Sequence, residues 1–296
     1  MPARFRRARV LIVGCGDVGQ RVARLLPAPV RVLALNRDAA QTLALRARGV
    51  QPLAGDLDDT ASLRRLAGIA SRVIHLAPPP AEDEGDPRTT ALLHALARRG
   101  VPAALVYAST SGVYGDCGGA LVAETRALHP GTARARRRVA AEQAVRAFGR
   151  MSGARASILR IPGIYAPDRE GGTPRQRLLR GTPVLAPEDD VFTNHIHADD
   201  LARACIAALW RGRPQRVVHA NDDSRMRMGE YFDLAADLYG LPRPPRIGRV
   251  AASQQLPPAL WSFMGESRRL DNTRLKRELR LRLRYPTPHS GLLPTK

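Results

Sequence analysis

The chain has 296 residues, of which 44% are hydrophobic, so it can bury a core for one large α/β domain or for two unequal lobes, and intrinsic disorder is not expected. Its net charge of +20 is almost entirely arginine spread along the sequence, and only 4% of the residues are aromatic, which argues against nucleic acid as a specific partner. The three cysteines are widely separated, the apolar runs are too short to cross a bilayer, and the basic N-terminus lacks the apolar stretch of a signal peptide; we therefore expect a cytoplasmic protein without a membrane partner.

The first half of the chain alternates short apolar runs with helical patterns, which is typical of βαβ units on a parallel sheet. Strands are predicted at residues 9–13, 30–35, 50–54, 72–76, 103–108 and 156–161. Helices are predicted between them, at residues 17–26, 39–48, 59–66, 87–99 and 132–148. This order predicts an α/β fold with a doubly wound parallel sheet.

The second half has a different composition, because prolines and glycines become frequent after Pro162. Helical patterns remain at residues 198–210, 228–239, 258–264 and 272–279, separated by irregular stretches. We expect one domain over residues 1–161, a smaller C-terminal lobe over residues 162–296, and a return of residues 191–219 to the first domain.

The sequence GCGDVG follows the first predicted strand and opens the first predicted helix. Gly14 permits the tight turn, Gly16 lets a pyrophosphate approach the backbone, and Gly19 lets the helix pack closely on the strand. The helix N-terminus, with Asp17 and Val18 in its first turn, offers free N–H groups to the phosphates. The motif in this context predicts a Rossmann-type domain that binds a dinucleotide.

The end of the second predicted strand distinguishes NAD from NADP. An NAD site usually places a carboxylate there, bonded to the ribose 2′-hydroxyl. This chain has Asn36 and Arg37 instead, and an arginine can bind a 2′-phosphate through two parallel hydrogen bonds. Asp38 follows, but it precedes a helix and is predicted to cap it. We expect NADP, with NAD left open.

At this point the sequence resembles the short-chain dehydrogenase/reductase superfamily, in its extended or atypical NAD-dependent epimerase/dehydratase-like branch. Beside the glycine turn, the resemblance rests on GDL at 55–57, HLA at 75–77, STSGVYG at 109–115, RIPGIYAP at 160–167, NHIHADDLA at 194–202 and LRYPT at 283–287. The glycine turn departs slightly, since extended members usually show GxxGxxG and Val13 stands at the first position.

The resemblance implies roles for several residues. Asp56 would contact the adenine with Leu57 beside it, and Leu76 and Ala77 would line the cofactor. The catalytic hydroxyl of the family would fall on Thr110 or Ser111.

One departure from the family concerns its catalytic pair, Tyr-x-x-x-Lys, whose spacing puts both side chains on one face of the helix after the fifth strand. Counting back from Glu142, which fits the glutamate of that helix, the lysine position falls on Arg138 and the tyrosine position on Arg134. Arg138 could still bond a ribose, but an arginine does not release its proton at neutral pH. The arginines could equally form a solvated basic face. Because an arginine cannot take the place of the tyrosine, the proton exchanged with the substrate would have to come from Tyr114, Tyr165, water, or the hydroxyl of Thr110 or Ser111.

The leading interpretation is an NADP(H)-dependent oxidoreductase or epimerase-like enzyme with a degenerate Tyr-x-x-x-Lys pair. Its substrate would be a small polar carbonyl or hydroxyl compound of sugar-derived type, bound between the C-terminal lobe and the strand ends. The candidate catalytic residues are Thr110, Ser111, Tyr114 and Arg138, with Arg138 also a cofactor ligand. No metal is expected, and a homodimer is compatible with the sequence. The alternative is a non-catalytic NADP(H)-binding redox sensor.

Overall fold

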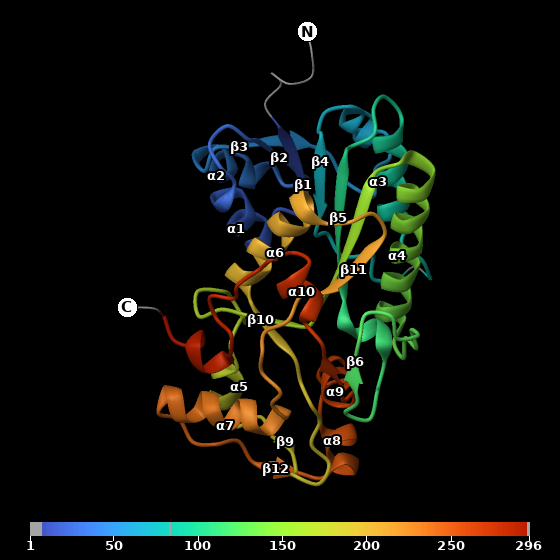
Figure 1. Ribbon diagram of the computed structural model, residues 1–296. Helices are drawn as coiled ribbons and strands as arrows, with labels where there is room; N and C mark the ends of the chain where they lie inside the picture. Colours follow the sequence, from blue (N-terminus) through green and yellow to red (C-terminus); the bar gives the residue numbers. More distant parts are fainter. Residues whose placement is uncertain (1–7, 83, 295–296) are drawn as a thin grey trace.

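The computed structural model describes residues 8–82 and 84–294, and a parallel sheet of seven strands forms the centre of its upper half (Figure 1). The strands follow the order β11-β7-β5-β4-β1-β2-β3, and every neighbouring pair is parallel. Their bounds are β1 (Arg9–Val13), β2 (Arg31–Asn36), β3 (Val50–Ala54), β4 (Arg72–His75), β5 (Ala104–Thr110), β7 (Arg155–Ile161) and β11 (Arg216–His219). The order reverses at β1 and β4, and a ligand crevice is expected at the carboxyl ends of such strands.

Helices cover both faces of the sheet, because successive side chains of a buried strand point to opposite faces. Val10 and Ile12 of β1 join one core cluster, whereas Leu11 and Val13 join the other. The first face carries α1 (Asp17–Leu25), α2 (Thr42–Ala47) and α6 (Ala198–Arg211). The second face carries α3 (Pro87–Ala97), α4 (Ala133–Ser152) and the 3-10 turn η3 (Ser62–Leu66). The fold is the expected Rossmann-type α/β sandwich.

The lower half in Figure 1 is built mainly from segments that follow β7 and has its own core around Phe232 and Met264. Its elements are β8 (Gly163–Tyr165), α5 (Arg175–Leu179), β9 (Val184–Leu185), β10 (His195–His197), α7 (Met228–Tyr239), β12 (Arg246–Ile247), α8 (Arg249–Gln255) and α9 (Pro258–Met264). The chain returns to the sheet in between, because α6 packs beside α1 and β11 pairs with β7.

The remaining elements are short. They are η2 (Ala39–Gln41), η4 (Ser111–Tyr114), β6 (Leu121–Val122), β13 (Arg269–Leu270), α10 (Thr273–Arg277) and η5 (Pro288–Ser290). The strand pair β6–β13 joins the loop after β5 to the last part of the chain. This loop therefore lies against residues that follow it by about 150 positions in the sequence.

Most predicted elements are confirmed, and the differences have local causes. Helix α4 runs four residues beyond its predicted end, to Ser152, and the left-handed backbone of Gly153 (φ 73°) closes it. The predicted helix at 39–48 begins as the 3-10 turn η2, where the Asp38 side chain accepts a hydrogen bond from Ala40 N at 2.9 Å. The predicted helix at 59–66 is only the 3-10 turn η3. The sequence places His195 and His197 on a strand, which β10 confirms, but it does not predict β8, β11 or the two-residue strands, which are too short to show a clear periodicity.

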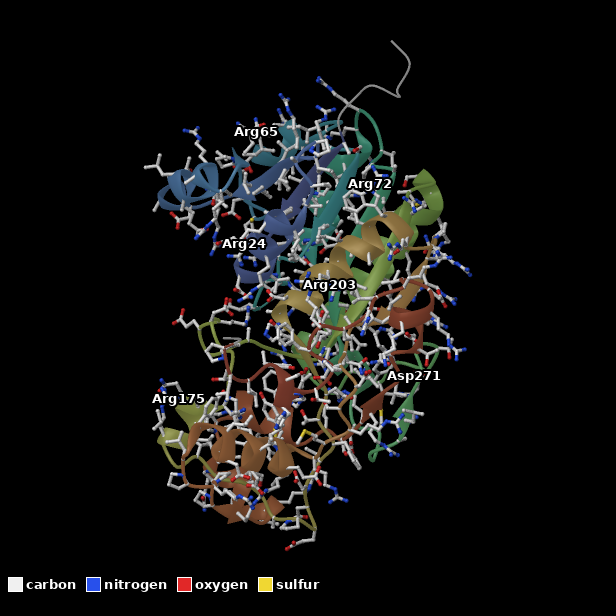
Figure 2. All side chains as sticks on the ribbon, turned by 60° about the vertical axis from the view of Figure 1, so that its left-hand side comes forward. Arg24, Arg65, Arg72, Arg175, Arg203 and Asp271 are labelled. Atoms are coloured by element: carbon white, nitrogen blue, oxygen red, sulfur yellow. The ribbon has the colours of Figure 1, made fainter. Side chains whose placement is uncertain are left out.

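Arginines are distributed over the whole molecule, from Arg65 at one end to Arg175 at the other (Figure 2). Ion pairs occur both within single elements and between distant segments, and the structure shows no separate basic tail within the described residues. The described helices include none that combines the length and the apolar character needed to cross a membrane.

Candidate cofactor cleft and active site

The glycine turn between β1 and α1 has the geometry that its sequence predicts. Gly14 has a φ of +86°, and a Cβ at this position would lie 2.5 Å from the Ala77 backbone nitrogen. A Cβ at Gly19 would lie 3.0 Å from the Gly14 carbonyl oxygen, so only glycine permits this close packing of helix on turn. At Gly16 nothing lies within 4 Å of an added Cβ. The backbone is thus open where a pyrophosphate would approach the first turn of α1.

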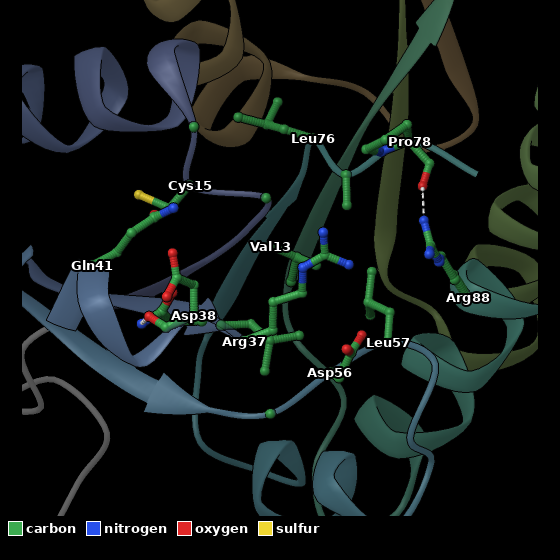
Figure 3. A pocket seen from close by; sticks show the side chains of 16 residues that line it. Val13, Cys15, Arg37, Asp38, Gln41, Asp56, Leu57, Leu76, Pro78 and Arg88 are labelled. Carbon is green, nitrogen blue, oxygen red and sulfur yellow. Dashed lines mark hydrogen bonds between the residues drawn. The ribbon is translucent and has the colours of Figure 1, made fainter. Parts of the chain in front are cut away.

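A cavity of about 890 Å³ extends from this turn to the ends of β2, β3 and β4 (Figure 3). It brings together most of the residues that the sequence assigned to the cofactor: Gly14, Gly16, Asn36, Arg37, Asp56, Leu57, Leu76 and Ala77. The cavity mixes apolar walls with hydrogen-bonding groups, as a site for an adenosine half does. The residues present therefore fit a dinucleotide.

Arg37 is exposed and its guanidinium points into this cavity (Figure 3). The Asn36 side chain is held in place because its Nδ2 donates to the Asp38 carbonyl oxygen at 2.7 Å. The Asp38 carboxylate caps η2, as predicted from its position before a helix. On the opposite wall, Arg88 is engaged by Asp58 through a two-pronged ion pair, with Nε to Oδ1 at 2.6 Å. Arg37 is therefore the cation of this cavity that remains available to an anionic group.

A second cavity of about 490 Å³ continues the cleft past the glycine turn and shares Gly14, Gly16 and Leu76 with the first. Asp17, Val18 and Gly19 line its near side. Its far side is formed by the end of β5 and the first turns of α4. The pyrophosphate and nicotinamide halves of a dinucleotide have room here.

Helix α4 places Arg134, Arg138 and Glu142 at successive intervals of four, as the count from Glu142 predicted. The Arg138 side chain is half-buried, and its Nη1 donates to the Ala108 carbonyl oxygen at 2.7 Å and to the Tyr107 hydroxyl at 3.0 Å. Arg134 is more exposed and its guanidinium lies 4.6 Å from the Phe263 ring centroid. Arg138 therefore faces the second cavity from a fixed position and is not part of a solvated face.

A third cavity of about 570 Å³ meets the second at Thr110 and extends into the C-terminal lobe. Thr110 and Ser111 stand at its inner end, and the Thr110 Oγ1 accepts from the Gly112 backbone nitrogen at 3.2 Å. Because this hydroxyl accepts from the backbone, its own proton remains free to be donated. The wall that faces them is charged, with Glu266 Oε2 lying 2.7 Å from Arg268 Nη1.

Tyr114, predicted as a catalytic candidate, does not reach any of these cavities. It is fully buried, and its hydroxyl lies 2.6 Å from both His219 Nε2 and Arg160 Nη1. Burial raises the pKa of this phenol to about 12 and lowers the pKa of His219 to about 4. We therefore correct the prediction: Tyr114 is a structural residue behind β5, because the turn η4 directs its ring inward. Tyr165 does line the third cavity, but its hydroxyl donates to the Thr287 carbonyl oxygen at 3.2 Å.

Glu142 and Arg160 form a buried ion pair behind the same strand ends, and each side chain is 2% exposed. Arg160 Nη2 lies 2.7 Å from Glu142 Oε2, and Nε lies 3.0 Å from Oε1. Ser109 Oγ donates to the same carboxylate at 2.6 Å. This network ties α4 to β5 and β7, and so fixes Thr110 and Arg138 relative to each other.

Several charged residues of the cleft were missed by sequence reasoning. Arg169 lines the second cavity, and Arg177, Glu266 and Arg268 line the third. All four come from segments after β8 that carry no recognisable pattern. The one available signal was the position of Arg169, two residues beyond the RIPGIYAP segment.

Comparisons with known proteins agree with this geometry. The profile of the "NAD dependent epimerase/dehydratase family" matches residues 10–220. A structure of a functionally unknown conserved protein from Silicibacter pomeroyi is 31% identical, with a TM-score of 0.79 over 96% of both chains. UDP-glucuronic acid 4-epimerase from Bacillus cereus, in complex with NAD, is 18% identical with a TM-score of 0.76, again over 96% of both chains. UDP-glucose 4-epimerase from Thermotoga maritima, with UDP-glucose, is 20% identical with a TM-score of 0.77 over the same share. No curated protein matches the sequence.

Proposed function

Because the chain belongs to the NAD-dependent epimerase/dehydratase family, we propose that it is an NADP(H)-dependent oxidoreductase or epimerase acting on a small, sugar-derived substrate. Membership makes the chain an enzyme that takes a nicotinamide dinucleotide. The choice of NADP and the substrate class follow from its own residues. The observation that carries the proposal is one continuous cleft, from Arg37 through the glycine turn to Thr110 and the charged third cavity.

Arg37 supports the preference for NADP. Its guanidinium points into the adenosine half of the cleft, whereas the neighbouring carboxylate of Asp38 is occupied in capping η2. A 2′-phosphate would meet a free cation there, and the ribose 2′-hydroxyl of NAD would meet no dedicated acceptor. The contact with Arg37 thus adds binding energy only for the phosphorylated dinucleotide.

The nicotinamide ring, when bound, supplies the hydride acceptor or donor. Around its side of the cleft, Arg138 of α4, fixed by its hydrogen bond to the Ala108 carbonyl oxygen of β5, would hold the ribose and provide positive charge. Thr110 would donate a hydrogen bond from its free hydroxyl to a substrate oxygen, and Ser111 lines the same end. Glu266, the ion-pair partner of Arg268 in the lining of the same cavity, would accept the proton that the missing tyrosine would have carried.

The third cavity supports a polar and anionic substrate. Three guanidinium groups line it, those of Arg134, Arg177 and Arg268, and Arg177 lies 4.3 Å from the Phe232 ring centroid. Aromatic and apolar side chains form the remaining wall, among them Tyr231 and Leu260. Such a lining accommodates a sugar ring that carries a phosphate or carboxylate. The Bacillus cereus and Thermotoga maritima neighbours are epimerases of UDP-sugars, which belong to this chemical class.

Incubation with UDP-glucose or UDP-glucuronic acid and NADP⁺ tests the proposal, with absorbance at 340 nm and chromatographic analysis of the sugar as readouts. We expect a new sugar product, or NADPH formation, that falls at least about tenfold in Thr110→Val because a positioned hydrogen-bond donor is lost. The specific observation that favours the alternative, a non-catalytic NADP(H) sensor, is the arginine at the tyrosine position. Tight NADP(H) binding without turnover of either sugar nucleotide would favour that sensor.

A further inference from the structure

The loop that follows β8 crosses from the C-terminal lobe to the first turn of α1. Its Arg169 reaches the glycine turn, where Nη1 lies 2.8 Å from Asp17 Oδ2. The two residues are 152 positions apart in the sequence. The pair therefore joins the lobe to the segment that opens the cofactor cleft.

A buried cation fixes this junction. Arg21, in the second turn of α1, has a side chain that is only 4% exposed and contacts three carboxylates. The distances are 2.6 Å from Nη1 to Asp199, 2.7 Å from Nη2 to Asp168 and 3.1 Å from Nε to Asp17. Burial alone would lower the pKa of Arg21, but the hydrogen bonds to Asp168 and Asp199 raise it above its usual value.

This network holds Arg169 in place from two sides. Asp168, its neighbour in the chain, is bound to Arg21, and Asp17 binds both arginines through its two carboxylate oxygens. Of the three carboxylates, only Asp17 lines the second cavity, together with Arg169. Asp168 and Asp199 are turned toward Arg21, so Arg169 is the cation on the cavity side.

The Arg169 guanidinium has N–H groups that its ion pair with Asp17 does not use. Within residues 8–82 and 84–294, its side chain is bound by Asp17 through Nη1, and the side chain is 30% exposed. It lines the same cavity as Gly14 and Gly16, beside the open backbone at Gly16 and the N-terminus of α1. The planar Arg169 guanidinium, with unused N–H groups at this place, can donate parallel hydrogen bonds to the oxygens of a phosphate.

We propose that Arg169 is a cofactor-binding residue that contacts the pyrophosphate of the dinucleotide from the C-terminal lobe, with the Arg21 cluster as its anchor. The pyrophosphate is thereby held between the N–H groups of α1 and a guanidinium from the other half of the chain. The inference rests on dinucleotide binding in this cleft, but not on the preference for NADP or on turnover, because NAD and NADP share the same pyrophosphate.

Isothermal titration of the full chain with NAD⁺, NADP⁺ and ADP-ribose tests this contact in wild type, Arg169→Gln and Arg169→Lys. We expect Arg169→Gln to weaken all three ligands by a similar factor, about 10- to 100-fold, because a charge-assisted hydrogen bond is lost from a group common to them. Arg169→Lys keeps the positive charge but cannot donate two parallel hydrogen bonds, so its affinities should lie between those of wild type and Arg169→Gln. The matched control is Arg175→Gln, which removes an exposed arginine of the same lobe and should leave all three affinities unchanged.

The competing role, in which Arg169 only neutralises Asp17, is separated by Asp17→Asn in the Arg169→Gln background. If Arg169 contacts the phosphates directly, the double variant stays weak; restored affinity would overturn the proposal. Unchanged affinity in both Arg169 variants would also overturn it, as would a loss confined to NADP⁺, which would place Arg169 near the 2′-phosphate. Thermal unfolding of each variant, recorded beside the titrations, verifies that the folded protein is compared, and Arg169→Lys decides the question if Arg169→Gln does not fold.

Discussion

Replacement of Arg138 by alanine is expected to weaken NADP(H) binding by about 1.5–3 kcal/mol, the usual contribution of a hydrogen bond from a charged group, or about 10- to 150-fold in Kd. The guanidinium is held at the end of β5 through a single nitrogen, on Ala108 and Tyr107, so its other N–H groups are available to the nicotinamide-side ribose. The same change leaves the hydroxyl of Tyr107, a fully buried residue, without this partner. We therefore also expect the free energy of unfolding to fall by about 1–3 kcal/mol.

Fluorescence or calorimetric titration with NADPH, at a temperature well below unfolding, separates the two effects. Arg136→Ala is the matched control, because it removes an exposed arginine from the same helix and should change the affinity by no more than about 0.5 kcal/mol. Arg138→Lys restores the residue type of the family and should keep most of the affinity. Unchanged NADPH affinity in Arg138→Ala would refute the ribose contact and would mean that this face of α4 has only a structural role.

Three further predictions concern the cofactor, the buried ion pair and pH. Arg37→Ala should weaken NADPH at least several-fold more than NADH by calorimetry, because only NADPH carries the 2′-phosphate; equal losses would contradict the assignment. Glu142→Gln should lower the free energy of unfolding in urea by about 3–5 kcal/mol, because a buried arginine loses its counter-charge; a change below about 1 kcal/mol would contradict the role of the pair. Burial lowers the pKa of His75 and His195 to about 3 and that of His219 to about 4. The unfolded chain therefore binds protons that the folded chain does not, and stability present above pH 6.5 should be lost as the pH falls toward 4. His75→Gln should reduce that slope by up to about 1.4 kcal/mol per pH unit in equilibrium unfolding, and an unchanged slope would argue that His75 is protonated in the folded state.

The sequence predicts the cofactor side of the molecule well, because the chemistry there is local. The glycine turn, the Asp38 cap and the spacing of Arg134, Arg138 and Glu142 each depend on residues within one element or one turn. Six of the seven strands of the sheet show their apolar runs in the sequence, whereas the four-residue strand β11 is not predicted. The two-residue strands β9 and β12 are defined by their pairing with each other, which no local pattern encodes.

The catalytic side is less predictable for two physical reasons. The direction of a side chain can depend on one turn, and η4 points Tyr114 into a buried network instead of the cleft. The charged lining comes from distant segments, so Arg169 meets Asp17 across 152 positions, and Glu266 joins Thr110 in the lining of one cavity only through the tertiary fold. The direction of a side chain and the meeting of distant segments both depend on tertiary packing, and the spacing of residue types in the sequence does not encode them.

A crystal structure with NADP⁺ bound tests the central claim most directly. The account predicts the 2′-phosphate on the Arg37 guanidinium, the pyrophosphate over Gly16 at the start of α1, and the nicotinamide ring beside Thr110, with its ribose on Arg138. A cleft without dinucleotide at saturating NADP⁺, or a nicotinamide ring turned away from Thr110 and the third cavity, would contradict it.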